Sequence, residues 1–143
     1  MTGPEYTQAN EGCRLSSYLD TRGVPTIGYG CTGPTVVLGL IWSQDQADEQ
    51  FTFRYAQAEH SATLILGEGS WATLNEVRQA VLADMCYQLG AGGLTEFQHM
   101  LAAVRAQAWQ MAHDQCLNSA YAHQTPARAQ RNATMLLTGI WQE

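Results

Sequence analysis

Two carboxylic acids and a hydroxyl lie close together in the N-terminal part of the sequence. Glu11 is followed by Asp20 and then by Thr26, and Gly28 and Gly30 come directly afterwards. Glycoside hydrolysis needs two carboxyl groups, one to protonate the leaving oxygen and one to orient water or attack the anomeric carbon. Glu11, Asp20 and Thr26 are therefore candidates for this chemistry. The alternative is a chance pair of acids, with Asp20 as a turn residue and Thr26 as a strand former.

The local pattern predicts a helix that ends at Glu11. Pro4 and Glu5 are typical of a first helical turn, because proline fits where no amide hydrogen bond is needed and an acid suits the positive end of a helix. Gly12 can adopt the left-handed conformation that ends a helix. Glu11 then lies at a helix C-terminus, where the helix dipole disfavours an acid.

A β-hairpin is predicted directly after this helix. Residues 14–20 alternate between two faces, which is typical of a half-buried strand. Residues 20–23 have turn chemistry, and residues 24–29 are rich in strand formers. Folding the hairpin brings Asp20 close to Thr26, and the bare backbone of the two glycines leaves room for a ligand against the sheet.

Helical patterns dominate the rest of the chain. Ser43 with Gln46 forms a capping box that opens a long helix, which Gly67 ends. Thr73 with Glu76 forms a second capping box, and the helix that follows is apolar on nearly all sides, which predicts the core of a helical lobe.

The remaining segments are less uniform. Residues 36–42 form an apolar run whose length fits either a strand or a linker. Three further helices are predicted, from Phe97 to Val104, from Trp109 to Leu117, and from Pro126 to Gly139 with Thr125 as the cap.

The composition limits the class of partner. The sequence contains seven basic residues, all of them arginine, and thirteen acidic residues, so the net charge is −6. An acidic chain has no electrostatic reason to bind nucleic acid or an anionic membrane surface. No apolar run is long enough for stable membrane insertion, and the N-terminus lacks the pattern of a signal peptide. The four cysteines and four histidines show no metal-ligand spacing. Free thiols are expected, and a disulfide between Cys13 and Cys31 is the alternative.

The residues of the first segment also match a known pattern, which consists of Glu11, Gly12, Arg14, Leu15, Tyr18, Asp20, Gly23 and Thr26-Ile27-Gly28-Tyr29-Gly30. This pattern closely resembles the active-site segment of phage-type lysozymes, the muramidases used as endolysins. Later blocks resemble the same family in the same order, namely Val77-Arg78, Tyr87-Gln88-Leu89-Gly90, Gln124-Thr125-Pro126-Ala127-Arg128-Ala129 and Thr138-Gly139-Ile140-Trp141. Cys31 departs from the family, which commonly has histidine there.

The resemblance implies a role for each candidate residue. Glu11 would be the general acid, Asp20 would activate water or stabilise the oxocarbenium-like transition state, and Thr26 would help hold the attacking water. A carboxylate separation of about 6.5–9.5 Å would give inversion of configuration, which we expect. The resemblance also implies that Arg128 supports the catalytic acid. It further implies that substrate is bound by Gly30, Tyr87, Gln88, Gly90 and Gln124. For Tyr87 the alternative is a core aromatic residue.

The expected fold class is α+β, mainly α. The expected architecture is a lysozyme-like, two-lobed fold in one domain over residues 1–143, with an N-terminal helix (1–12), a β lobe with a small hairpin sheet (13–42), a connecting helix (43–67) and a C-terminal helical lobe (70–143).

The expected function is that of an endolysin. Such an enzyme hydrolyses the β-1,4 bond between N-acetylmuramic acid and N-acetylglucosamine of bacterial peptidoglycan and causes host cell lysis, with no cofactor or metal. We expect a monomer that stays in the host cytoplasm before lysis and acts on the cell wall after release. The alternative is a catalytically weak peptidoglycan-binding or virion-structural module of the same fold. The intact Glu11, Asp20 and Thr26 argue against this alternative, while the acidic charge and the lack of lysine favour it.

Overall fold

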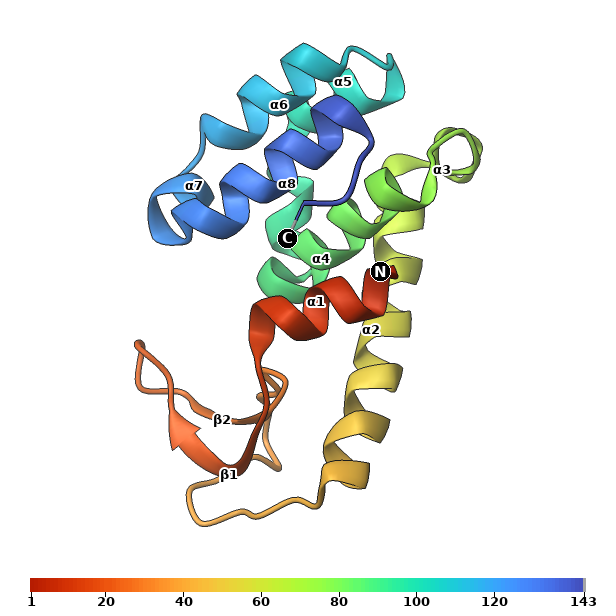
Figure 1. Cartoon of the computed structure of the whole chain (residues 1–143). Helices are drawn as coiled ribbons and strands as arrows, with labels where there is room; N and C mark the ends of the chain where they lie inside the picture. Colours follow the sequence, from red (N-terminus) through yellow and green to blue (C-terminus); the bar gives the residue numbers. More distant parts are fainter. Residues whose placement is uncertain (143) are drawn as a thin grey trace. The chain divides into compact units, whose positions relative to one another are not determined.

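The chain begins with a helix, continues with a β-hairpin and then forms a series of helices. The structure is a computed structural model and describes residues 1–142 (Figure 1). Its elements are α1 (Gly3–Glu11), β1 (Arg14–Leu19), β2 (Pro25–Gly28), α2 (Gln44–Leu66), α3 (Glu68–Ala72), α4 (Glu76–Thr95), α5 (Gln98–Arg105), α6 (Trp109–Leu117), α7 (Ala120–Gln124) and α8 (Pro126–Thr138). The described chain is thus mainly helical with one small antiparallel sheet near the N-terminus, which confirms the expected α+β class.

The chain divides into two compact units. The N-terminal unit is Pro4–Gln57, and the C-terminal unit is Met1–Gly3 with Ala58–Glu143. The first unit contains nearly all of α1, both strands and the first part of α2. The second contains the end of α2 and helices α3 to α8.

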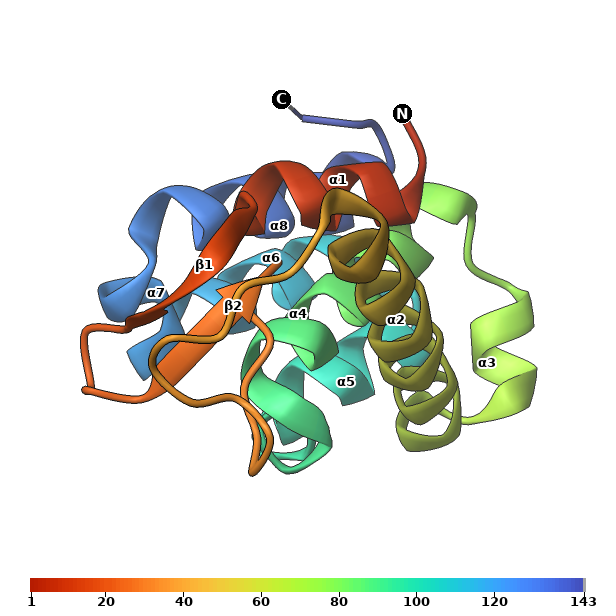
Figure 2. The ribbon, with the colours of Figure 1, turned by 90° about the horizontal axis from the view of Figure 1, so that it is seen from below.

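Helix α1 and the hairpin form as their sequences predict. Gly12 has φ 66°, and its amide donates to the carbonyl of Gln8 (2.9 Å), so α1 ends at Glu11. Strands β1 and β2 lie side by side and pair antiparallel, with Tyr18 opposite Thr26 (Figure 2). Both strands are shorter than expected, because pairing is limited to 14–19 and 25–28.

The segment 36–42, which fitted either a strand or a linker, follows the free edge of β1 as irregular chain. Ile41 forms an isolated antiparallel bridge to Ser16. The amide of Trp42 donates to the carbonyl of Leu15 (2.8 Å). These contacts cover backbone groups of β1 that would otherwise be exposed at an edge.

Helix α2 begins with the predicted capping box. The amide of Gln46 donates to Ser43 Oγ (3.1 Å), and the amide of Ser43 donates to Gln46 Oε1 (2.8 Å). Gly67 follows the helix with φ 105°. At this end Arg105 donates from Nε to the carbonyl of Leu66 (2.8 Å) and from Nη2 to that of Ile65 (2.8 Å), so its guanidinium closes the last turn.

Helix α4 is the buried helix of the C-terminal unit, as predicted. Residues 80–86 are all buried, and α8 packs against α4. The expected capping box of Thr73 with Glu76 is wrong. The cap is Asn75, whose side chain accepts from the amide of Arg78 (3.0 Å), while the Thr73 hydroxyl donates to the carbonyl of Ser70 (2.6 Å) at the end of α3.

Helix α8 starts at Pro126 and ends at Gly139, which has φ 69°. The expected cap Thr125 does not cap it with its side chain; the Thr125 hydroxyl instead donates to the carbonyl of Tyr121 (3.3 Å). Arg78 closes the other end of α8, with Nε on the carbonyl of Leu136 (2.8 Å) and Nη2 on that of Leu137 (3.1 Å).

Candidate active site

The carboxylate of Glu11 lies against the backbone of Gly30. Glu11 is the last residue of α1 and is partly buried. A Cβ atom at position 30 would lie 2.6 Å from Glu11 Oε2, and Gly30 has φ 77°, a conformation that side chains rarely adopt. The absence of a side chain at Gly30 therefore makes the space that the Glu11 carboxylate occupies.

Asp20 holds the hairpin turn with one carboxylate oxygen. Oδ1 accepts from the amides of Arg22 (2.8 Å) and Val24 (2.9 Å). The hydrogen bond from Val24, followed by that from Arg22 and the charge of the Arg22 guanidinium, lowers the pKa of Asp20 below its usual 3.8 in spite of some desolvation. Within the described residues Oδ2 accepts no hydrogen bond, so the second oxygen of a charged carboxylate is available to solvent or ligand.

Thr26 shares a hydrogen-bond acceptor with Asp20. The Thr26 hydroxyl donates to the carbonyl of Val24 (2.9 Å), and the amide of Asp20 donates to the same oxygen (3.0 Å). Thr26 Oγ1 and the amide nitrogen of Asp20 are therefore no more than two hydrogen-bond lengths apart, as the hairpin predicts. Because the hydroxyl proton is already donated, Thr26 Oγ1 can offer only lone pairs to a further partner. Thr26 is 4% exposed, so its hydroxyl is held in a fixed place.

The other candidate residues belong to the C-terminal unit. Tyr87 and Gln88 lie within α4, just before Gly90, where φ 79° and ψ 166° interrupt the helix. Gln124 is the exposed last residue of α7. Gln88 Nε2 donates to Thr125 Oγ1 (3.2 Å), next to Gln124 in the sequence, while Gln88 Oε1 is buried without a hydrogen-bond partner in the described chain. Their roles in substrate binding stay predictions.

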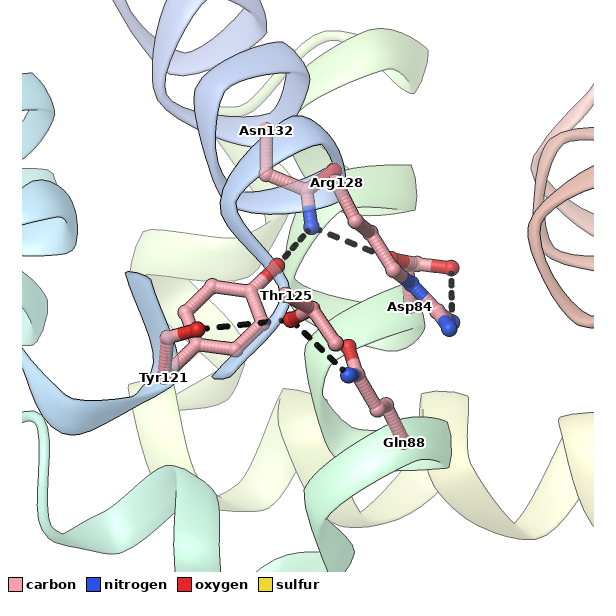
Figure 3. Close-up of polar contacts among 6 residues, drawn as sticks. All are labelled: Asp84, Gln88, Tyr121, Thr125, Arg128 and Asn132. Carbon is pink, nitrogen blue, oxygen red and sulfur yellow. Dashed lines mark hydrogen bonds and ion pairs between the residues drawn. The ribbon is translucent and has the colours of Figure 1, made fainter. Parts of the chain in front are cut away.

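Arg128 belongs to a buried polar network in the C-terminal unit (Figure 3). Its Nε donates to Asp84 Oδ2 (3.0 Å) and its Nη2 to Asp84 Oδ1 (2.8 Å), which makes a two-pronged ion pair. Asn132 Nδ2 donates to Asp84 Oδ2 (3.0 Å) and to the hydroxyl of Tyr121 (2.7 Å). Asp84 and Asn132 are fully buried, and Arg128 is 8% exposed.

Sequence reasoning missed Asp84, although a signal was present. A single acid interrupts the apolar run from Val81 to Cys86, and a buried acid needs a cation or several donors. The Arg128 guanidinium is that cation. The support of Glu11 by Arg128, which the resemblance implies, stays a prediction.

The thiols and other possible metal ligands add no further site. All four cysteines are thiols outside disulfides, with Cys13 exposed and Cys31, Cys86 and Cys116 buried. Burial raises the pKa of Cys116 to about 12. Residues 1–142 contain no group of three or more His, Cys, Asp or Glu that could hold a metal ion. No helix in that range combines the length and apolar character that a membrane span requires.

A side chain at position 30 should disturb Glu11. We expect Gly30→Ala to lower kcat/KM about a hundredfold, because the new methyl group displaces the Glu11 carboxylate and a misplacement of about 1 Å has an effect of this size. The left-handed backbone adds about 1–2 kcal/mol of destabilisation. Gly23→Ala is the matched control, since Gly23 also has positive φ (78°) but nothing lies within 4 Å of its Cβ position. Equal activity losses in the two variants would contradict the role of the Glu11 contact.

Comparison with known proteins gives the family of the chain. The family model for phage lysozyme matches residues 8–133, which include Glu11, Asp20, Thr26 and Arg128. The chain is 29% identical to the pre-baseplate central spike protein Gp5 of Enterobacteria phage T4, over 97% of this chain but only 28% of that protein. It is 26% identical to the "Probable T4-type lysozyme 2" of Dictyostelium discoideum and 28% identical to the "Probable T4-type lysozyme 1", with at least 90% of both chains covered in each comparison.

Proposed function

The chain belongs to the phage lysozyme family, and from this premise we propose that it hydrolyses the β-1,4 bond between N-acetylmuramic acid and N-acetylglucosamine in bacterial peptidoglycan. The observation that carries the proposal is the corner of the hairpin, where the free Oδ2 of Asp20 and the lone pairs of Thr26 Oγ1 are both acceptors. Glu11 supplies the second carboxyl group that the reaction needs.

Glu11 acts as the general acid. It donates its proton to the oxygen that bridges the two sugars as the bond to the anomeric carbon breaks. Positive charge then develops on the sugar ring, and the Asp20 carboxylate stabilises that charge. The lowered pKa of Asp20 suits this task because it extends the pH range of the ionised carboxylate to more acidic pH.

Asp20 and Thr26 hold the attacking water. A water molecule that donates one proton to Asp20 Oδ2 and the other to Thr26 Oγ1 has both of its protons engaged. Its lone pairs are then directed away from the two acceptors, toward the substrate. A water held in this place would attack the anomeric carbon directly and pass a proton to the Asp20 carboxylate, so we infer inversion of configuration rather than a covalent sugar intermediate.

Purified bacterial sacculi provide the test. We expect soluble products with new reducing ends on N-acetylmuramic acid, detected as muramitol after borohydride reduction. Reducing ends on N-acetylglucosamine would contradict the bond assignment, and soluble products without reducing ends would indicate a lyase. Proton NMR of the first product should show the α anomer if the reaction inverts. Co-sedimentation of the chain with sacculi, with no soluble product, would support a binding module instead.

The pH dependence tests Asp20. The charged form is the active one, so activity should persist as the pH falls until the lowered pKa of Asp20 is reached. We expect the acidic limb of the kcat/KM profile to lie below pH 3.8. The stability of the fold should also fall as the pH falls. The Asp20 carboxyl has a lower pKa in the folded state, so it stabilises the fold at pH values above its pKa in the unfolded state. This contribution is lost as the pH falls through its pKa in the folded state.

The matched variant is Asp20→Asn. Its amide oxygen can still accept from the amides of Arg22 and Val24, so the turn should keep its shape while the charge is lost. We expect kcat/KM to fall by about 10²-fold or more with little change in Tm. A variant that stays active, or a wild-type acidic limb near pH 5, would contradict the assignment to Asp20.

A second candidate is a lysozyme module carried on a virion. It is favoured by the similarity to the central spike protein, of which this chain spans about a quarter of the length. The two candidates differ in where the enzyme meets the wall, either released in a lysing host or mounted on an infecting particle. Mass spectrometry of purified particles separates them, because a virion module is present in stoichiometric amounts and an endolysin is not.

A further inference from the structure

The segment that faces Glu11 is a tight turn with one side chain at its tip. The amide of Ile27 donates to the carbonyl of Cys31 (3.0 Å), and the amide of Cys31 donates back to Ile27 (2.8 Å). Between them lie Gly28 and Gly30, both with positive φ, and Tyr29. Tyr29 is therefore the only residue of the tip with a side chain that can anchor it.

Each glycine of the turn lies against a different neighbour. A side chain at Gly30 would collide with the Glu11 carboxylate. A Cβ atom at Gly28 would lie 2.9 Å from Cζ3 of Trp42 and 3.7 Å from Cβ of Ala47, the latter on α2. The turn thus fills the space between the end of α1 and the start of α2, and its position sets how closely Gly30 approaches Glu11.

Tyr29 fastens this turn to one face of α2. Its hydroxyl donates to Asp48 Oδ1 (3.0 Å) and accepts from Gln44 Nε2 (3.2 Å), and Gln44 also donates to the same Asp48 oxygen (2.8 Å). The Tyr29 ring packs on that of Phe51, with centroids 5.2 Å apart. Residues 44, 48 and 51 follow the i, i+4, i+7 spacing of one helix face. Burial and the nearby Asp48 raise the pKa of Tyr29, so the phenol remains a donor.

We propose that Tyr29, held by Asp48 and Gln44, is a positioning residue for the catalytic acid: it fixes the turn that carries Gly30 and thereby fixes the Glu11 carboxylate. The proposal rests on the proposed function, since it assigns a purpose to the place of Glu11. The role proposed for Tyr29 is indirect and needs no contact with the substrate or with the reacting atoms. Loss of its hydroxyl should impair the chemical step and leave substrate binding unchanged.

Steady-state kinetics on solubilised peptidoglycan tests the proposal with the full chain. We expect Tyr29→Phe to lower kcat about tenfold or more with KM unchanged, because the acid is misplaced. Asp48→Ala should have the same effect, and the double variant should be no worse than either single one, since both remove the same hydrogen bond. Asp48→Asn keeps an acceptor oxygen for Tyr29 and should recover most of kcat.

Ser43→Ala is the control for a merely structural effect. It removes the cap of the same helix and should lower Tm, but it leaves the Tyr29 contacts intact and should keep wild-type kcat. The proposal is overturned if Tyr29→Phe keeps wild-type kcat, if its loss appears only in KM, or if Ser43→Ala loses as much kcat at an equal Tm.

A second readout works without activity. The amides of Ile27 and Cys31 close the turn, so their hydrogen exchange reports its rigidity. We expect both amides to exchange faster in Tyr29→Phe than in Ser43→Ala at matched stability. If the wild type releases no reducing ends, the proposed function fails while this measurement still tests the anchoring of the turn. Equal exchange in the two variants would overturn the anchoring.

Discussion

Replacement of Glu11 by glutamine should lower kcat/KM by about 10²–10⁴-fold, the range that a general acid contributes. Glutamine has the same shape as glutamate, so it can occupy the space against Gly30, but it has no acidic proton to give to the bridging oxygen. The loss should appear mainly in kcat, because the proton is transferred only as the bond breaks. Release of reducing ends from sacculi under saturating conditions measures it.

Glu5→Gln is the matched control for this variant. It makes the same chemical change in the first turn of the same helix, at an exposed position. We expect wild-type kcat for Glu5→Gln, and for Glu11→Gln a Tm close to that of the wild type. Equal activity of Glu11→Gln and the wild type would remove Glu11 as the acid, and a large fall in Tm would mean that the loss reflects unfolding.

Replacement of Asp84 by leucine should lower the free energy of unfolding by about 3–5 kcal/mol. The substitution leaves the guanidinium of Arg128 buried without its two carboxylate acceptors, and it removes an acceptor from Asn132. Asp84 supplies an ion pair and two hydrogen bonds that offset the cost of burying this guanidinium, and the substitution removes them. Urea unfolding followed by far-ultraviolet circular dichroism measures the change.

Two further variants show whether the loss of stability comes from breaking the buried ion pair or from removing any acid. Asp84→Leu combined with Arg128→Met replaces the ion pair by apolar side chains and should recover much of the lost stability. Asp114→Leu removes an exposed acid paired with His113, and should cost less than about 1 kcal/mol. If Asp84→Leu and Asp114→Leu were equally stable, the network around Arg128 would contribute little to stability.

Local chemistry explains why the N-terminal unit could be predicted closely. Gly12 ends α1 because the conformation it adopts is one that few other residues tolerate, and the two partners of the Ser43 capping box are only three residues apart. The hairpin follows from alternation and a turn. In each case the residues that decide the structure are neighbours in sequence.

Contacts over long sequence distances explain what was missed. Asn75 rather than Thr73 caps α4, and its side chain also donates to the carbonyl of Gly139, sixty-four residues away. The short helices α3 and α7 have too few residues for a periodic pattern. The partner of Asp84 lies forty-four residues further along the chain, so the acid was visible in the sequence but its cation was not.

The fixed places of several arginines bear on how this protein responds to ionic strength. Of the seven cations in the chain, Arg78 and Arg105 close helix ends and Arg128 is paired with Asp84, and thirteen acids outnumber all seven. Attachment to an anionic wall polymer then gains little from long-range attraction. Salt should here screen mainly the repulsion between this acidic protein and such a polymer.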